Sequence, residues 1–129
     1  MRRTLTCVGL LLAGAAIMTA CASPTTSGDS SDPAAIEGVW GDSTADNAPY
    51  LEFSADGEVV GSDGCNALNG TYKFDGETAQ VELGVSTLKG CLNVDTWLRD
   101  VASVQPIDDV LSVYDHEGES IGTLDREGT

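Results

Sequence analysis

The feature that most limits how this chain can fold is a series of short alternating runs, each ended by a glycine-containing turn. Asp56-Gly57 and Asp75-Gly76 each separate two runs in which apolar and polar residues alternate. Alternation places the apolar side chains on one face of a strand, and Asp-Gly between two such strands is typical of a β-hairpin. The pattern therefore predicts antiparallel strands joined by tight turns.

The same pattern continues through the second half of the chain. Residues 110–114 and 120–124 form two more runs around a turn at 115–118, which predicts a terminal hairpin. One short helix is predicted, with Asp95 as its N-cap and Pro106 at its end. Its apolar residues at helical spacing are Trp97, Leu98, Val101 and Val104. A second, single helical turn is expected between Asp63 and Gly70. Many strands and one helix indicate a mainly β domain of the α+β class over residues 36–127.

The first 20 residues differ in character from this domain. Two basic residues, Arg2 and Arg3, precede an apolar stretch over residues 5–18, which is typical of a secretory signal peptide. The segment 17–21 ends in small residues before Cys21 and resembles a bacterial lipobox, at which the signal is cleaved and the cysteine carries acyl chains such as palmitate. An uncleaved membrane helix is the alternative, because the apolar stretch is close to the ~20 residues that a span needs.

Residues 21–35 follow as the lipidated cysteine and a polar tether, rich in Ser, Thr and Pro. A flexible coil of that length spans roughly 20 Å on average. We therefore expect a domain outside the cytoplasm, held at the cell membrane through the lipid on Cys21. Loss of residues 1–20 leaves four basic side chains against 21 acidic ones, a net charge of −17. Such a domain repels phosphate backbones, which argues against nucleic-acid binding.

The four cysteines have different predicted fates. Cys7 lies in the signal peptide and Cys21 takes the lipid, which leaves Cys65 and Cys91 in an oxidising compartment. We predict a disulfide between them. A zinc site would need four ligands, whereas the chain has one histidine and no CxxC pair. A catalytic thiol would need a histidine base and an orienting group.

Several short motifs follow one another along the predicted domain. They are Gly38-Val39-Trp40, Leu51-Glu52-Phe53-Ser54-Ala55-Asp56-Gly57, Gly61-Ser62-Asp63-Gly64-Cys65-Asn66, Gly70-Thr71-Tyr72, Thr87-Leu88-Lys89-Gly90-Cys91 and the turn from Asp115 to Gly118. Together they resemble the META domain family, also called HslJ-like after a bacterial heat-shock protein. The resemblance implies a twisted antiparallel sheet of about six to eight strands with a short helix packed on it. It implies no cofactor and no settled activity, and associates the chain with envelope proteins linked to stress tolerance, secretion or motility.

We expect the motif residues to be structural. Gly64 would let the chain turn, Asn66 would satisfy backbone groups of the turn that follows, and Thr87 would satisfy a buried backbone group near the disulfide. Gly70 and Tyr72 complete the family motif. We assign no catalytic residue and no metal ligand, and expect a solvated turn residue at His116.

Three classes of function follow from these residues. The first is a monomeric, non-catalytic interaction module that binds another envelope protein or an exposed peptide. The second is a protein that binds a cation or another small ligand through its acidic surface. The third is a hydrolase, which would need two carboxylates in one cleft; the adjacent Asp108 and Asp109 are better explained as a turn, because neighbouring strand residues point to opposite faces.

Overall fold

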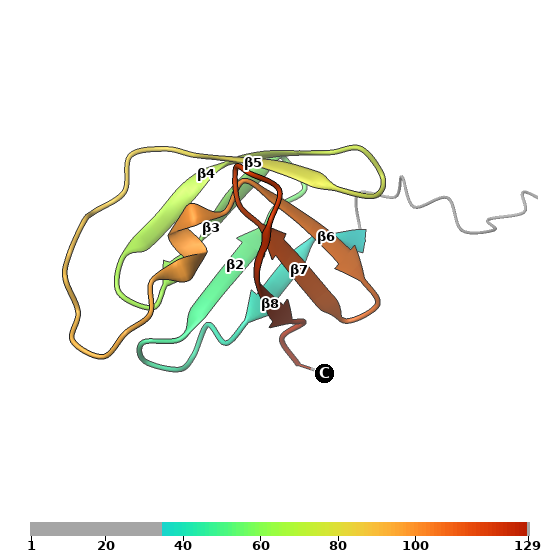
Figure 1. The fold of residues 1–129 in the computed structure, drawn as a ribbon. Coiled ribbons are helices and arrows are strands. Elements are labelled where there is room, and N and C mark those ends of the chain that lie inside the picture. Colours follow the sequence, from blue (N-terminus) through green and yellow to red (C-terminus); the bar gives the residue numbers. More distant parts are fainter. Residues whose placement is uncertain (1–34, 129) are drawn as a thin grey trace, which may run out of the picture.

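The structure is a computed structural model that describes residues 35–128. The predicted signal peptide, Cys21 and nearly all of the predicted tether lie outside these residues. Eight strands form one antiparallel sheet (Figure 1), and each strand pairs with the next along the chain. They are β1 (Gly38–Gly41), β2 (Pro49–Phe53), β3 (Glu58–Asp63), β4 (Ala67–Phe74), β5 (Ala79–Leu83), β6 (Ser103–Ile107), β7 (Val110–Tyr114) and β8 (Ser120–Asp125).

The sheet curls until its two outer strands meet. Trp40 of β1 forms an antiparallel bridge with Arg126, which follows β8. The backbone N–H of Glu127 also donates to the carbonyl of Val39 at 2.9 Å. These bonds join the edges that an open sheet would leave unpaired, so the domain is nearly a closed barrel.

Arg126 reinforces this closure. Its guanidinium lies 4.0 Å from the ring centre of Trp40 and donates to the carbonyls of Ala35 (2.8 Å) and Glu37 (3.0 Å). Asp109 lies 3.7 Å from its Nε atom. Arg126 thus fixes the point at which the chain enters the barrel to the strand that closes it.

The interior of the barrel is filled by the inward-facing side chain of every second strand residue. The fully buried Trp40 also donates from its Nε1 atom to the carbonyl of Ile36 at 2.8 Å, which satisfies its one polar group. Residues that are at most 5% exposed form one cluster with Tyr72: Ile36, Trp40, Leu51, Phe53, Val59, Leu68, Ala79, Val81, Leu98, Val101, Val104, Leu111, Val113 and Leu124. The alternating runs therefore act as predicted, with one face of each strand in the core.

Among strands that are consecutive along the chain, β5 and β6 share the fewest paired residues. Only two residue pairs join these strands, Ala79 with Val104 and Gln80 with Ser103. Beyond them the chain leaves the sheet in a loop over residues 84–96, which we call the long loop, and returns through the 3-10 helix η2 (Trp97–Asp100). Leu98 of η2 is fully buried and closes this side of the core.

The predicted hairpins are confirmed. Asp56-Gly57 joins β2 to β3, Asp75-Gly76 lies between β4 and β5, and 115–119 joins β7 to β8. The predicted fold class is also confirmed, because residues 35–128 form one antiparallel sheet with the short helical element η2. Within the described residues, no helix has the length and apolar character needed to cross a membrane.

The predicted α-helix after Asp95 is wrong in extent. Only Trp97–Asp100 is helical, with no side-chain cap, and Val104 belongs to β6, where it pairs with Val113. Leu98 and Val104 are both buried in the core, but Leu98 reaches it from a helical turn and Val104 from a strand. Pairing with β7 therefore determines the conformation at Val104, in place of the helical spacing of the sequence.

The predicted helical turn between Asp63 and Gly70 is also absent. Asp63 ends β3, residues 64–66 form the turn, and Gly70 lies inside β4, opposite Val59 and Leu83. Glycine is needed there for close approach of two strands. A Cβ atom on Gly70 would lie 2.1 Å from the carbonyl oxygen of Glu82.

Gly70→Ala should therefore destabilise the domain by about 3 kcal/mol, because β4 and β5 must separate to admit a methyl group. Gly90→Ala is the matched control: a Cβ at Gly90 meets nothing within 4 Å, and we expect a change below about 0.5 kcal/mol. Urea unfolding of both variants measures the difference. Equal midpoints for the two variants would show that the strands do not approach this closely.

Tyr72 makes the aromatic contact of the core. Its ring meets Phe53 edge to face with centres 5.0 Å apart, and its hydroxyl donates to the carbonyl of Ser54 at 2.7 Å. Burial raises the pKa of Tyr72 above the ordinary 10.0, and the charges of Glu37 and Asp56 raise it further.

This shift predicts a loss of stability at high pH. The folded state favours the neutral phenol, so its stabilising effect is complete below pH 10.0 and falls as pH rises through the folded-state pKa. The urea midpoint of the native protein should fall more steeply above pH 10 than that of Tyr72→Phe, which shares every other titrating group. Parallel curves for the two proteins would refute the assignment.

Candidate functional site

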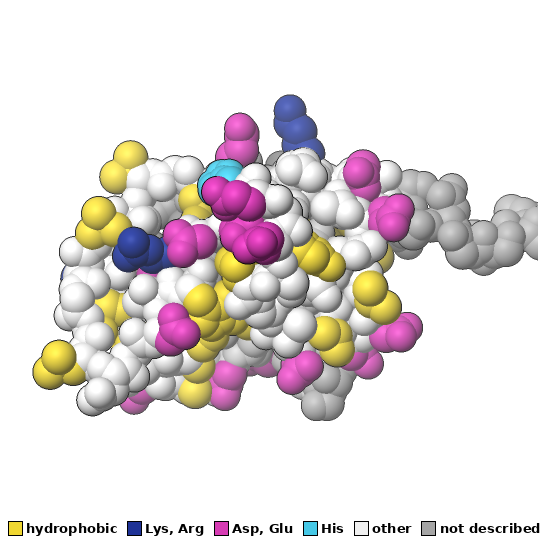
Figure 2. All heavy atoms as spheres, in the orientation of Figure 1, with side chains coloured by type: hydrophobic (Ala, Val, Ile, Leu, Met, Phe, Trp, Pro, Cys, Tyr) yellow, Lys and Arg dark blue, Asp and Glu magenta, His cyan; other side chains and the backbone are white. Residues whose placement is uncertain are grey.

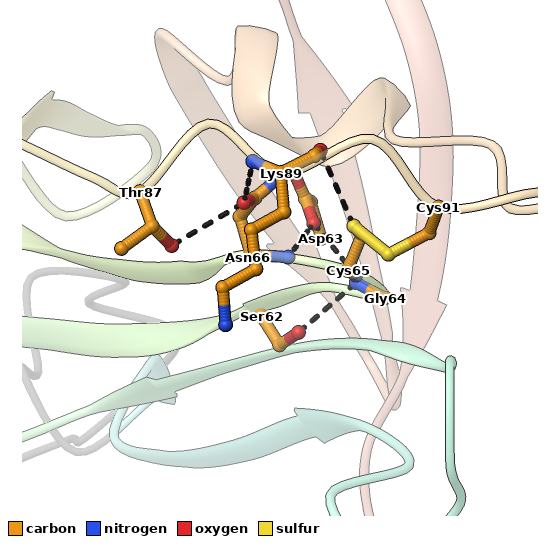
Figure 3. The surroundings of a disulfide bond; sticks show 8 residues. All are labelled: Ser62, Asp63, Gly64, Cys65, Asn66, Thr87, Lys89 and Cys91. Atoms are coloured by element: carbon orange, nitrogen blue, oxygen red, sulfur yellow. Dashed lines mark hydrogen bonds between the residues drawn. A yellow bond between two sulfur atoms is a disulfide. The ribbon is translucent and has the colours of Figure 1, made fainter.

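The motif segment Gly61-Ser62-Asp63-Gly64-Cys65-Asn66 lies at the corner between β3 and β4, where the chain reverses through residues 64–66 (Figure 3). Gly64 has a φ of +95°, a conformation that L side chains rarely adopt. A Cβ there would also lie 2.7 Å from the carbonyl oxygen of Asn47 and 3.0 Å from Val94. Glycine is therefore required at this corner for both conformation and space.

Asp63 holds the corner from inside. Its side chain is fully buried, and one carboxylate oxygen accepts from the backbone N–H groups of Cys65 (2.8 Å) and Asn66. The other carboxylate oxygen accepts from the side-chain amide of Asn66 at 3.5 Å. A buried carboxylate is tolerated here because it receives several hydrogen bonds, and it fixes the turn in return.

The predicted disulfide between Cys65 and Cys91 is present in the structure. It joins the corner to the long loop across 26 positions of sequence. Cys65 Sγ also lies 3.4 Å from the carbonyl oxygen of Lys89. The bond therefore pins the middle of a loop that has no sheet partner of its own.

Asn66 makes a second connection to the same loop. Its side-chain oxygen accepts from the backbone N–H of Lys89 at 2.6 Å, and its amide nitrogen donates to the carbonyl of Lys89 at 3.2 Å (Figure 3). The amide thus pairs with Lys89 as a neighbouring strand would. The predicted partner was wrong: Asn66 binds a segment 23 positions away and not the turn that follows it.

Thr87 also binds a different group from the one predicted. Its hydroxyl donates to the side-chain oxygen of Asn66 at 3.3 Å and not to a buried backbone group. Asn69 adds one more contact, from its amide nitrogen to the carbonyl of Val85 at 3.4 Å. We call Asp63, Asn66, Thr87 and the disulfide the loop clamp, since together they fix the long loop to the barrel.

The structure brings together five of the motif residues and separates two. Gly64, Cys65, Asn66, Thr87 and Cys91 meet at the clamp, whereas Gly70 and Tyr72 serve the strand packing described above. The sequence prediction missed the role of Asp63 as a buried acceptor, although its position before a glycine turn was a usable signal. It could not have found Lys89, because only the backbone of that residue takes part.

The long loop exposes apolar side chains to solvent. Val85 and Leu92 are each 94% exposed and Leu88 is 80% exposed. Figure 2 shows hydrophobic side chains projecting along the left-hand edge of the molecule, on the side where Figure 1 places the long loop. The clamp therefore fixes a loop whose apolar side chains are exposed to solvent and not buried in the core.

A separate hollow of about 550 Å³ lies between the outer faces of β4 and β5 and the β7–β8 turn. Lys73, Glu82, Ser103 and His116 are among its lining residues. His116 is exposed on the turn, as expected, and forms no hydrogen bond or ion pair with another described residue. Within residues 35–128, no side chain therefore holds the imidazole of His116 in a fixed orientation through a hydrogen bond.

Apart from the buried Asp63, the described Asp and Glu residues are exposed or partly exposed. Within the described part of the chain, no three His, Cys, Asp or Glu side chains gather into a set that could hold a metal ion. Asp75 accepts from the N–H groups of Thr78 and Glu77, in that order of effect, and these bonds lower its pKa. The pKa of Asp42 is lowered in the same way, first by the hydroxyl of Thr44. Both carboxylates therefore serve as turn acceptors.

The comparisons with known proteins agree with this architecture. Residues 34–124 match the model of the META domain family, a range that includes β1 to β7, all of β8 except its last residue, and every residue of the clamp. No curated protein and no solved structure matches the chain. Since the match extends over most of the sequence, the chain belongs to the META domain family.

Proposed function

We propose that this chain is a lipid-anchored protein of the cell envelope, held at the membrane through Cys21, whose META domain is a non-catalytic interaction module. Its partner would be another envelope protein or an exposed peptide. The observation that supports the proposal is the pairing of Asn66 with both backbone groups of Lys89. Through this pairing, the polar side chain of Asn66 holds the long loop against the barrel.

Each polar group of the motif has an internal partner. Asp63 accepts from the turn, Asn66 donates and accepts at Lys89, and Thr87 donates to Asn66. Cys65 is bonded to Cys91 and has no free thiol. A catalytic group needs a partner on the substrate, whereas these groups are satisfied within the chain. A clamp that holds an exposed loop in one conformation suits recognition, because binding then costs less conformational entropy.

The anchor is supported by the sequence of residues 1–21 and by a disulfide that requires an oxidising compartment. The test is the intact mass of the protein extracted from membranes, before and after reduction and alkylation. A chain that begins at Cys21 with added acyl mass, and two thiols that appear only on reduction, is the expected result. A full-length, unmodified chain would contradict the anchor.

The non-catalytic part has a separate test. The purified protein is incubated with peptidoglycan fragments, phospholipids and peptides, and product is followed by mass spectrometry. We expect no saturable turnover of any of these substrates. Saturable turnover of any of them would contradict the proposal, and its loss on a change at the His116 hollow would place the active site there.

A further inference from the structure

The long loop differs in charge from the rest of the domain. Residues 83–94 contain no acidic side chain, and Lys89 is their one charged residue, in a chain that has 21 acidic residues. Acidic residues begin again at both borders, with Glu82 before the stretch and Asp95 after it. The three most exposed large apolar side chains of residues 35–128, Val85, Leu88 and Leu92, all fall within this stretch. An apolar centre with a charged border is the usual composition of a protein interface.

A third acidic residue, Asp46, is the sequence neighbour of a residue at the foot of the loop. It precedes Asn47, whose carbonyl lies against Gly64 next to Val94. Asp46, Glu82 and Asp95 are all exposed. The complementary surface of a partner would thus be apolar at its centre and basic around that centre, with an acidic group opposite Lys89.

Building on the proposed function, we infer that the three apolar side chains of the long loop are the docking surface of the domain. Their partner is a protein with an apolar groove bordered by basic side chains. The loop clamp holds these side chains outward before the partner arrives. Interface groups that are already in place lose less freedom on binding, which favours an otherwise small contact.

The position of the loop supports a partner that lies away from the anchoring membrane. Figure 1 shows the long loop at one side of the barrel and the start of β1, where the described chain begins, at the opposite side. The proposed anchor at Cys21 precedes β1 in the sequence, and a domain of this size is about 30 Å across. The loop therefore faces outward from the membrane more readily than toward it.

Two other occupants are less suitable. A second copy of the chain would bring two strongly acidic surfaces together, since each mature copy would carry a net charge of −17. The predicted tether cannot cover the loop from within, because residues 22–34 contain no large apolar side chain. These two possibilities remain as outcomes of the test.

The test is site-specific photo-cross-linking in intact cells that produce the full-length protein. Benzoylphenylalanine replaces Leu88, or Leu92 in a second strain. The matched control position is Ile107, which is also apolar and 55% exposed but lies at the end of β6. We expect one protein adduct of the same mass from both loop positions, at a yield about tenfold above that from Ile107.

Two further variants test the chemistry of the contact. With the photoreactive residue at Leu88, Leu92→Asp and Lys89→Glu should each reduce the adduct by about tenfold, whereas Ile107→Asp should leave it unchanged. The cross-linked partner peptide should come from an apolar groove with basic neighbours. The substitutions lie on exposed side chains, so the fold is retained and a melting curve verifies this.

Several results would overturn the inference. They are an adduct of lipid, an adduct with a second copy of the chain, equal yield from Ile107, or no adduct at all. If the acyl mass is present and adducts arise only from another face, the interaction module stands and the long loop is not its docking surface. If the acyl mass is absent, the proposed function fails whatever the cross-links show.

Discussion

Replacing both Cys65 and Cys91 with serine should lower the free energy of unfolding by about 3 kcal/mol. The disulfide closes a segment of 26 positions, and the loop-entropy estimate for that length gives a stabilisation of this size. A small β-domain of about 90 residues would lose roughly 15 °C in Tm. Differential scanning calorimetry of the native and double-serine proteins measures the change.

Reduction of the native protein with dithiothreitol is the matching control. It should lower the Tm by about as much as the double substitution and should leave the double-serine variant unaffected. The barrel itself should survive at low temperature, because its core does not include either cysteine. An unchanged Tm after complete reduction would show that the long loop is held without the disulfide.

Asn66→Ala should be comparably damaging, at about 2 to 4 kcal/mol. The substitution leaves the N–H and carbonyl of Lys89 without their partner, and the hydroxyl of Thr87 loses its acceptor. It also removes the side-chain donor to the buried carboxylate of Asp63. The side chain of Asn66 is only 2% exposed and the carboxylate of Asp63 is fully buried, so loss of the whole set of bonds at this corner accounts for a change of this size.

Asn69→Ala is the matched control for that variant. Asn69 also donates to the long loop, but through one 3.4 Å bond to Val85 in an exposed setting. We expect it to cost less than about 1 kcal/mol. Urea unfolding of the two variants separates them, and equal losses would mean that Asn66 contributes no more than a surface amide.

The hairpins were predictable because each is specified by neighbouring residues. Asp56-Gly57 and Asp75-Gly76 determine their turns locally, and alternation in the flanking strands sets which side chains enter the core. The same local argument failed at Leu98 and Val104. Their spacing suits a helix, but pairing of Val104 with Val113 places it in a strand instead.

Barrel closure and the loop clamp could not be predicted in the same way. Arg126 binds the carbonyl of Ala35 across 91 positions, and Asn66 binds Lys89 across 23. Both contacts use a backbone group as the partner, which every residue offers, so the sequence carries no sign of which one is chosen. The family pattern identified Asn66 and Thr87 as important without identifying what they bind.

The central claim is that the family motif fixes the long loop through the backbone of Lys89. Amide hydrogen exchange of the native protein, resolved at single residues by NMR, tests it most directly. If the 2.6 Å bond to Asn66 forms in solution, the Lys89 amide should exchange about 100-fold more slowly than that of the neighbouring Leu88. Equal exchange at Lys89 and Leu88 would show that the loop is free, and would contradict the clamp.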